Sequence, residues 1–161
     1  MPRLISPHKV AGVLVGALTV AALSVGPASA AQSTVDGAIG AGDKSCSWTG
    51  GVTSDTAPNN LTVDRSTINS PGGNLSCSGL SAALNNDPAV TFDDAAGTAT
   101  ADALDVSVTV VGVTCRYRSG VLTAQRDGTT RKYSATADVP LAEGGFLCPA
   151  SQTVSATLIF H

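Results

Sequence analysis

Apolar and polar side chains alternate along most of the chain after residue 44, which is the pattern of strands that bury one face. The clearest stretch is LDVSVTV, residues 104–110, where leucine and valine occupy every even position. The alternation recurs in TRKYSATADV, residues 130–139, and in QTVSATLIF, residues 152–160. Gly, Asn, Asp and Pro separate the segments, so the pattern predicts an all-β fold. We expect an antiparallel Ig-like β-sandwich with about seven to nine short strands. The shorter strands are expected at 45–48, 60–64, 74–80, 89–93, 113–118 and 121–126.

The phase of the alternation changes once. The apolar series of residues 104–110 ends at Val110, and the next one begins at the adjacent residue, with Val111, Val113, Cys115 and Tyr117. A shift of one residue moves every side chain to the other face, so we expect a bulge or a sheet-switching bend at this point, with Gly112 in an unusual backbone conformation. The Asp-Gly pair at 127–128 predicts a hairpin.

The first thirty residues have the order of a secretory signal peptide. Arg3 and Lys9 precede an apolar run over residues 10–25, and ASA at 28–30 has the small side chains of a cleavage site. Sixteen apolar residues fall short of the roughly 20 that a membrane-spanning helix needs. We therefore expect cleavage between Ala30 and Ala31, a secreted extracellular protein and no membrane span in the mature form.

The predicted domain organisation has three parts. Residues 1–30 are the signal peptide, residues 31–44 a flexible Gly-rich N-terminal arm or an edge strand, and residues 45–161 the β-sandwich domain. After cleavage, seven basic and twelve acidic side chains remain. This acidic balance argues against nucleic acid as a partner.

Four cysteines, an even number in an exported chain, indicate two disulfides. Three pairings are possible from sequence. We favour Cys46 with Cys77 and Cys115 with Cys148, because each bridge then links neighbouring strand segments within one half of the chain.

The most suggestive local chemistry is VTCRYRSG, residues 113–120. With Cys115 and Tyr117 on the inner face, Arg116 and Arg118 point outward together and could bind a carboxylate or a sugar acid. The alternative is an outer face kept soluble by charge. The candidate binding surface includes further basic residues on the adjoining hairpin, and its members are Arg116, Arg118, Arg126, Arg131 and Lys132.

The residue inventory argues against catalysis. The mature chain has one histidine, His161, at the C-terminus, and one glutamate, Glu143. A Ser-His-Asp or Cys-His site needs a histidine held by packing. Asp93 and Asp94 are more typical of a solvated turn than of a metal site or a catalytic pair. We expect no enzyme activity, no cofactor and no metal.

Several features occur together in this chain: the ASA-A leader, few lysines, four dispersed cysteines, the CRYR strand and the C-terminal segments FLCP and SATLIF. In this combination it resembles small secreted four-cysteine β-sandwich proteins of high-GC Gram-positive bacteria, most of which have no assigned function. The neocarzinostatin-like and subtilisin-inhibitor-like proteins are similar secreted sandwiches, but their cysteine spacings differ. No functional residues are carried over from either.

The leading hypothesis is a secreted, non-catalytic binding or cell-envelope module whose partner is an extracellular protein, a glycan or a cell-wall component. Three alternatives stay open. A protease inhibitor would present residues 141–149 as a rigid loop, and a small-molecule carrier would hold its ligand in the mouth of the sandwich. An Asp-dependent hydrolase would use Asp93 or Asp94 as its base.

Overall fold

The folded part of the chain is built from β-strands. The structure, a computed structural model, describes residues 32–161, so the expected signal peptide and its cleavage site lie outside the described residues. Within this range there are twelve strands and one short 3-10 helix. They are β1 (Thr34–Ala41), β2 (Lys44–Val52), β3 (Leu61–Thr62), η1 (Arg65–Thr67), β4 (Ser76–Ser78), β5 (Ser81–Leu84), β6 (Ala89–Asp93), β7 (Thr98–Ala101), β8 (Asp105–Val110), β9 (Val113–Arg118), β10 (Leu122–Arg126), β11 (Lys132–Glu143) and β12 (Ser151–Phe160).

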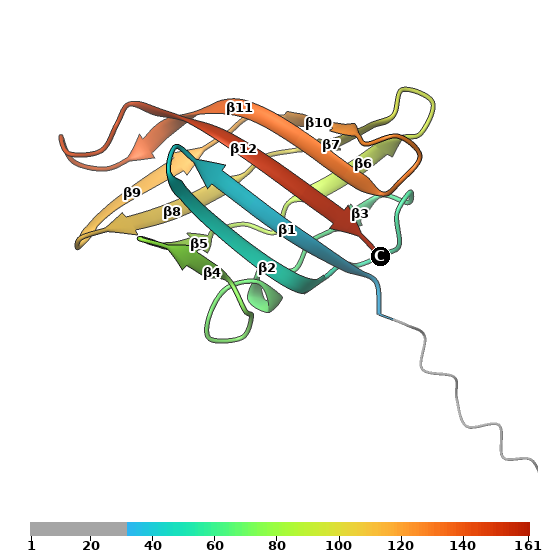
Figure 1. The fold of residues 1–161 in the computed structure, drawn as a ribbon, viewed down its shortest axis with the longest axis horizontal. Coiled ribbons are helices and arrows are strands. Elements are labelled where there is room, and N and C mark those ends of the chain that lie inside the picture. Colours follow the sequence, from blue (N-terminus) through green and yellow to red (C-terminus); the bar gives the residue numbers. More distant parts are fainter. Residues whose placement is uncertain (1–31) are drawn as a thin grey trace, which may run out of the picture. The chain divides into compact units, whose positions relative to one another are not determined.

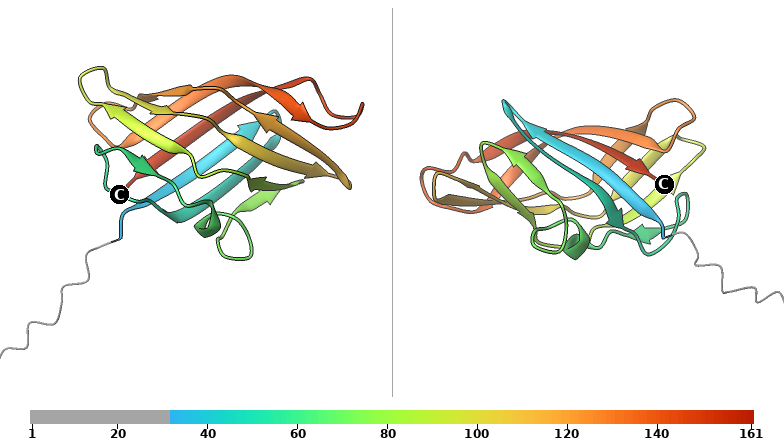
Figure 2. Two further views of the ribbon diagram at one scale, coloured as in Figure 1. Left: turned by 180° about the vertical axis from the view of Figure 1, so that it is seen from behind. Right: turned by 60° about the horizontal axis from the view of Figure 1, so that its bottom comes forward.

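All of these strands belong to one connected sheet, which curls into a half-barrel (Figure 1). The main path runs β3-β6-β7-β10-β11-β12-β1-β2-β4, and a branch of β5, β8 and β9 joins it at β11. The pairings are antiparallel. The two views of Figure 2 show that β8 and β9 lie across the interior from β1 and β2.

The long strand β11 is where the two branches meet. One of its edges pairs with β12 from Lys132 to Pro140. The other edge is shared, because Tyr133 and Ser134 pair with β10 while Leu141 and Glu143 pair with β9. The sheet therefore divides along this edge, and the strands on either side of the division diverge.

The far edges of the main path approach each other at one end. The amide of Asp64 donates a hydrogen bond to the carbonyl of Val52 (2.9 Å), and a bridge joins Thr53 to Val63. The buried core lies at this end and is made of Val35, Trp48, Leu61, Val63, Ile68, Val90, Ala99, Tyr133 and Phe160. The rings of Phe92, Tyr133 and Phe160 lie 5.1–5.9 Å apart between centroids. These are favourable aromatic distances, so the aromatic side chains fill this end of the interior.

The all-β class and the two disulfides are confirmed, but the architecture differs from the sequence prediction. The strands number twelve rather than seven to nine, and they form a single curled sheet instead of two separate layers. In the long strands that were predicted, the alternation gave the correct inner face. In β11, Tyr133, Ala135 and Val139 face inward as expected.

The segment predicted as a flexible arm or an edge strand is neither. Residues 34–41 form β1, which pairs with β12 on one side and with β2 on the other. β1 has small residues such as Gly37 where the indole of Trp48 packs over the strand. A Cβ built on Gly37 would lie 2.0 Å from Cζ2 of that indole.

The phase of the alternation changes after Val110 because the chain makes a tight turn there, and not because of the predicted bulge. Val110 pairs with Val113, so β8 and β9 form a hairpin joined by the two residues Val111 and Gly112. Their φ angles are 48° and 79°, the left-handed values that a tight two-residue turn requires. The unusual conformation predicted for Gly112 is therefore present, in a turn rather than a bend. The hairpin predicted at 127–128 joins β10 to β11.

Two disulfides join Cys46 to Cys77 and Cys115 to Cys148. The pairing predicted from the sequence is confirmed. The first bridge links directly opposed residues of β2 and β4. The second ties β9 to the loop between β11 and β12, so both bridges stabilise the end of the sheet that lies away from the aromatic core.

Candidate ligand-binding cavity

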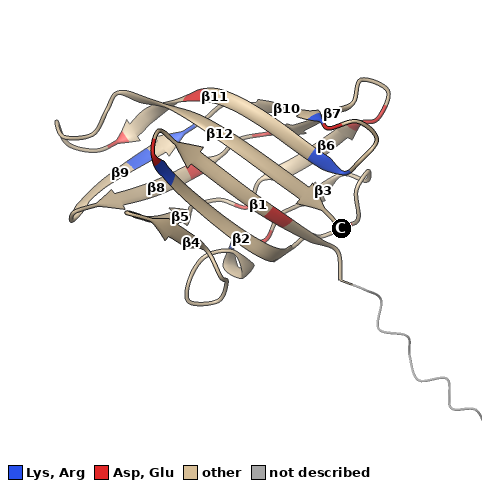
Figure 3. Cartoon of the chain, viewed as in Figure 1, with Lys and Arg blue, Asp and Glu red and all other residues tan. Residues whose placement is uncertain are grey.

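The five basic side chains expected to form one surface lie in two separate groups (Figure 3). Arg116 and Arg118 are on β9, beside the end of β11, whereas Arg126, Arg131 and Lys132 lie beside its start. At about 3.3 Å per residue, the two ends of this twelve-residue strand are about 35 Å apart. The single basic surface does not form, because β9 and β10 pair with opposite ends of β11.

The first basic group is an ion-pair cluster on the outer face of β8 and β9. Arg116 donates from Nε and Nη2 to both carboxylate oxygens of Asp105, each at 2.8 Å, and from Nη1 to Glu143 at 2.9 Å. Arg118 approaches the same aspartate at 3.9 Å, so both arginines point outward as expected. The hydrogen bonds from Arg116, and then that from Asn85, lower the pKa of Asp105 to about 2, although burial opposes the shift. The donors of Arg116 that could bind an anion are thus already used within the protein, and the Arg118 guanidinium, 64% exposed, lies beside the same carboxylate.

In the second group Lys132 pairs with Asp127 at 3.4 Å, whereas the two arginines pair with Asp94. Arg131 donates to its two oxygens at 2.6 and 3.0 Å, and Arg126 donates to one of them at 2.9 Å. These hydrogen bonds, chiefly those from Arg131, lower the pKa of the Asp94 carboxyl. Its neighbour Asp93 accepts from the amide of Ala96 and so caps a turn. Both carboxylates have structural partners, which does not favour the hydrolase hypothesis.

The loop proposed for protease inhibition is a tight turn. The amide of Cys148 donates to the carbonyl of Gly145 at 2.9 Å, and Phe146 is 97% exposed between them. A peptide that binds a partner by strand pairing must be extended. The turned backbone of this loop does not favour the inhibitor hypothesis.

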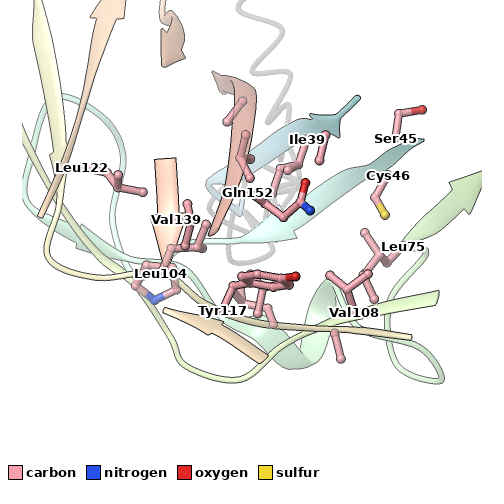
Figure 4. Close-up of a pocket in the computed structure, with 18 of the residues that line it drawn as sticks. Ile39, Ser45, Cys46, Leu75, Leu104, Val108, Tyr117, Leu122, Val139 and Gln152 are labelled. Atoms are coloured by element: carbon pink, nitrogen blue, oxygen red, sulfur yellow. The ribbon is translucent and has the colours of Figure 1, made fainter. Parts of the chain in front are cut away.

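An apolar cavity of about 500 Å³ lies inside the curled sheet (Figure 4). Its walls come from nearly every strand, including Ile39 on β1, Val108 on β8 and Tyr117 on β9. Protein interiors are normally packed with few voids larger than a water molecule. Cavities of 300–1,000 Å³ are typical of small-molecule sites. The interior therefore has room for a ligand.

The cavity exists because small side chains occupy inward positions in the middle of the long strands β11 and β12. Ala135 of β11 and Ala156 of β12 are directly opposed partners, and both line the hollow. At the other end of the same two strands the inward residues are Tyr133 and Phe160, which belong to the core. Aromatic rings therefore fill the interior at one end of β11 and β12, whereas the methyl groups of Ala135 and Ala156 leave space farther along the same strands.

The polar lining is sparse, and one group within it stands out. Gln152 precedes the inward series Val154, Ala156 and Leu158 by two residues, and its amide points into the hollow among Ile39, Tyr117 and Val108 (Figure 4). No other residue of 32–161 hydrogen-bonds to this amide. The sequence analysis missed Gln152, although its position in the alternation of residues 152–160 places it on the inner face.

The cavity reaches solvent at the end opposite the aromatic core. Val110 and Leu147 both line it, and they are 39% and 63% exposed. Val110 ends β8 at the β8–β9 turn, and Leu147 belongs to the β11–β12 loop. The turn and the loop lie at the same end of the sheet (Figure 1). Val111 and Phe146, the neighbours of these residues, are almost fully exposed. The entrance thus has an apolar rim.

Comparison with known protein families and curated proteins, and of the fold with solved structures, finds no match. Between residues 32 and 161 no helix has the length and apolar character needed to cross a membrane. In the same range no three or more His, Cys, Asp or Glu side chains are grouped so that they could hold a metal ion. Any inference about function must start from the geometry of the cavity.

Proposed function

We propose that the protein binds an apolar small molecule inside the curled sheet and acts as an extracellular carrier. The observation that carries this proposal is the open apolar cavity of about 500 Å³. Apolar surface that stays uncovered by packing forfeits stabilisation of about 25 cal/mol per Å². A ligand of matching polarity would recover that stabilisation, which supports a binding role for the hollow.

The proposal makes the leading hypothesis of a non-catalytic binding module more specific. Its occupant is a small apolar compound rather than an extracellular protein, a glycan or a cell-wall component. The basic side chains that would have recognised an acidic glycan are held in ion pairs with Asp105, Glu143, Asp94 and Asp127. The apolar cavity has no such competing partners.

We further propose that the protein is exported by its signal peptide and works outside a bacterial cell. Support comes from the two disulfides, which form and persist in oxidising compartments. The order of charged, apolar and small residues before Ala31 adds to this support. Apolar compounds are poorly soluble in water, so a carrier with an enclosed apolar site suits an aqueous extracellular space.

A titration with N-phenyl-1-naphthylamine, an uncharged probe that fluoresces in apolar surroundings, tests the binding role. We expect saturable binding to the oxidised wild-type protein. Ala135→Leu should weaken it at least tenfold, because the larger side chain fills the space opposite Ala156. Thr136→Val, at the exposed neighbouring position, is the matched control and should bind as the wild type does. Failure of the wild-type protein to bind the probe, or unchanged binding by Ala135→Leu, would overturn the proposal.

A further inference from the structure

The polar lining of the cavity narrows the class of ligand. Besides tyrosine and tryptophan, the polar or charged side chains among the lining residues are Lys44, Ser45 and Gln152. Ser45 is exposed at the margin of the site. The ammonium of Lys44 pairs with Asp43 at 3.3 Å, and its side chain is 38% exposed. The side-chain amide of Gln152 therefore projects into the hollow without a partner in the described chain. The Nε1–H of Trp48, another lining residue, is buried and also has no hydrogen-bond partner there.

An amide in apolar surroundings strongly favours a hydrogen-bonded state. The side chain of Gln152 carries two N–H donors and a carbonyl acceptor. Its neighbours in Figure 4, Ile39 and Val108, offer no hydrogen-bonding side-chain atom. The Tyr117 hydroxyl donates to the carbonyl of Pro149 at 3.3 Å, which leaves its lone pairs able to accept. One polar ligand atom near Gln152 would thus find both donors and acceptors.

The charge of the ligand follows from the same surroundings. Transfer of an ionised group from water to an apolar interior is strongly unfavourable unless a countercharge lies beside it. Among the lining residues of the described chain, the ionisable side chains are Lys44, Tyr117 and Tyr133, and none of them is a carboxylate. A carboxylate or an ammonium placed beside Gln152 would therefore be disfavoured, whereas a neutral carbonyl or hydroxyl group fits.

We propose that the cavity selects neutral apolar molecules that carry one carbonyl or hydroxyl group, and that Gln152 hydrogen-bonds to this group and sets the orientation of the ligand. This inference rests on the proposed function, because it assigns the ligand class of the same cavity. In small-molecule sites generally, apolar walls supply affinity while a few polar groups fix orientation. Here Gln152 is the polar group that fixes the orientation of the ligand.

A pair of isosteric probes separates hydrogen bonding from shape. In 2-acetylnaphthalene a carbonyl oxygen stands where 2-isopropenylnaphthalene has a CH₂ group. We expect Gln152→Met to weaken the ketone about fivefold to tenfold, the effect of one net hydrogen bond, and to leave the hydrocarbon unchanged or tighter. Gln125→Met, on the exposed face of β10, is the control and should change neither affinity. The folding of each variant is checked by its urea transition.

Two further measurements keep the inference open to refutation if Gln152→Met does not fold. Gln152→Leu removes the amide without placing a charge in the cavity, so it should also weaken the ketone selectively. In the wild-type complex, the C=O stretching band of the bound ketone should lie at lower wavenumber than in an apolar solvent. An unshifted band, or equal weakening of both probes in a folded variant, would overturn the role of Gln152 while the carrier function stands. If neither probe bound the wild-type protein, the carrier function itself would fail, and this inference with it.

Discussion

The indole of Trp48 occupies the space that a side chain at position 37 would need. Gly37 on β1 and Trp48 on β2 are directly opposed partners. A Cβ added at Gly37 would lie 2.0 Å from Cζ2 and 2.2 Å from Cη2 of the indole. Contacts this short do not occur between real atoms, so the position of the single tryptophan depends on glycine across the strand pair.

Gly37→Ala should therefore destabilise the protein by about 2 to 3 kcal/mol, the range for forcing extra atoms into a packed site. The measurement is the urea midpoint, followed by the fluorescence of Trp48. Gly40→Ala on the same strand is the control, because the nearest atom to its new Cβ would be the carbonyl oxygen of Lys44 at an ordinary 3.6 Å. Equal midpoints for the two variants would show that the indole is not held against β1.

The turn between β8 and β9 offers a stabilising substitution. Val111 is the one residue other than glycine with positive φ between residues 32 and 161, and it is 99% exposed. A β-branched side chain is disfavoured in the left-handed region, which asparagine tolerates. Val111→Asn should raise the free energy of unfolding by about 1 kcal/mol. Val121→Asn, at another exposed valine with negative φ, should be nearly neutral, and an equal gain there would remove the strain explanation.

The ion pair between Asp105 and Arg116 should contribute to stability more than the cluster around Asp94. Asp105 is only 4% exposed and accepts two hydrogen bonds from one guanidinium group. Asp105→Asn should cost about 2 kcal/mol in unfolding free energy, since the arginine then loses its charged partner. Asp94→Asn removes a carboxylate whose side chain is 45% exposed, and exposed pairs contribute little. A larger loss for Asp94→Asn, measured by urea unfolding, would contradict this ranking.

Stability should fall in acid, and Asp105 should account for part of the fall. Its pKa is about 2 in the folded protein against an ordinary value of 3.8. Its contribution is thus complete above about pH 4 and is lost as the pH falls toward 2. Over that window the carboxyl should account for about 2 kcal/mol. Urea unfolding of wild type and Asp105→Asn between pH 2 and 6 should give curves that converge in acid. Parallel curves would show that this carboxylate has no depressed pKa.

The sequence predicted those features that depend on neighbouring residues. Alternation identified the inner faces of β8, β9, β11 and β12, and the spacing of cysteines between strands led to the observed bridges. The curled sheet was not predicted, because it depends on β9 and β10 pairing with opposite ends of β11. The same long-range pairing separates Arg116 from Arg131, so the expected basic surface could not be tested by local pattern alone.

The cavity and its polar group were missed for a related reason. Ala135 and Ala156 read as ordinary inward residues of two strands, and only their pairing shows that two methyl groups face one space. Gln152 begins an apolar series, and in the sequence such a residue is typical of a strand end. Its significance depends on the distance between strands across the interior, which no local pattern records.

The site of probe binding can be mapped most directly by ¹⁵N chemical-shift NMR of the oxidised protein during titration with N-phenyl-1-naphthylamine. The carrier proposal predicts saturable shifts concentrated at residues that line the cavity, such as Val108, Tyr117, Ala135 and Gln152, with little change at Thr136 and Gln125 on the outer face. Shifts confined to the outer face, or a spectrum that does not respond to the probe, would contradict it.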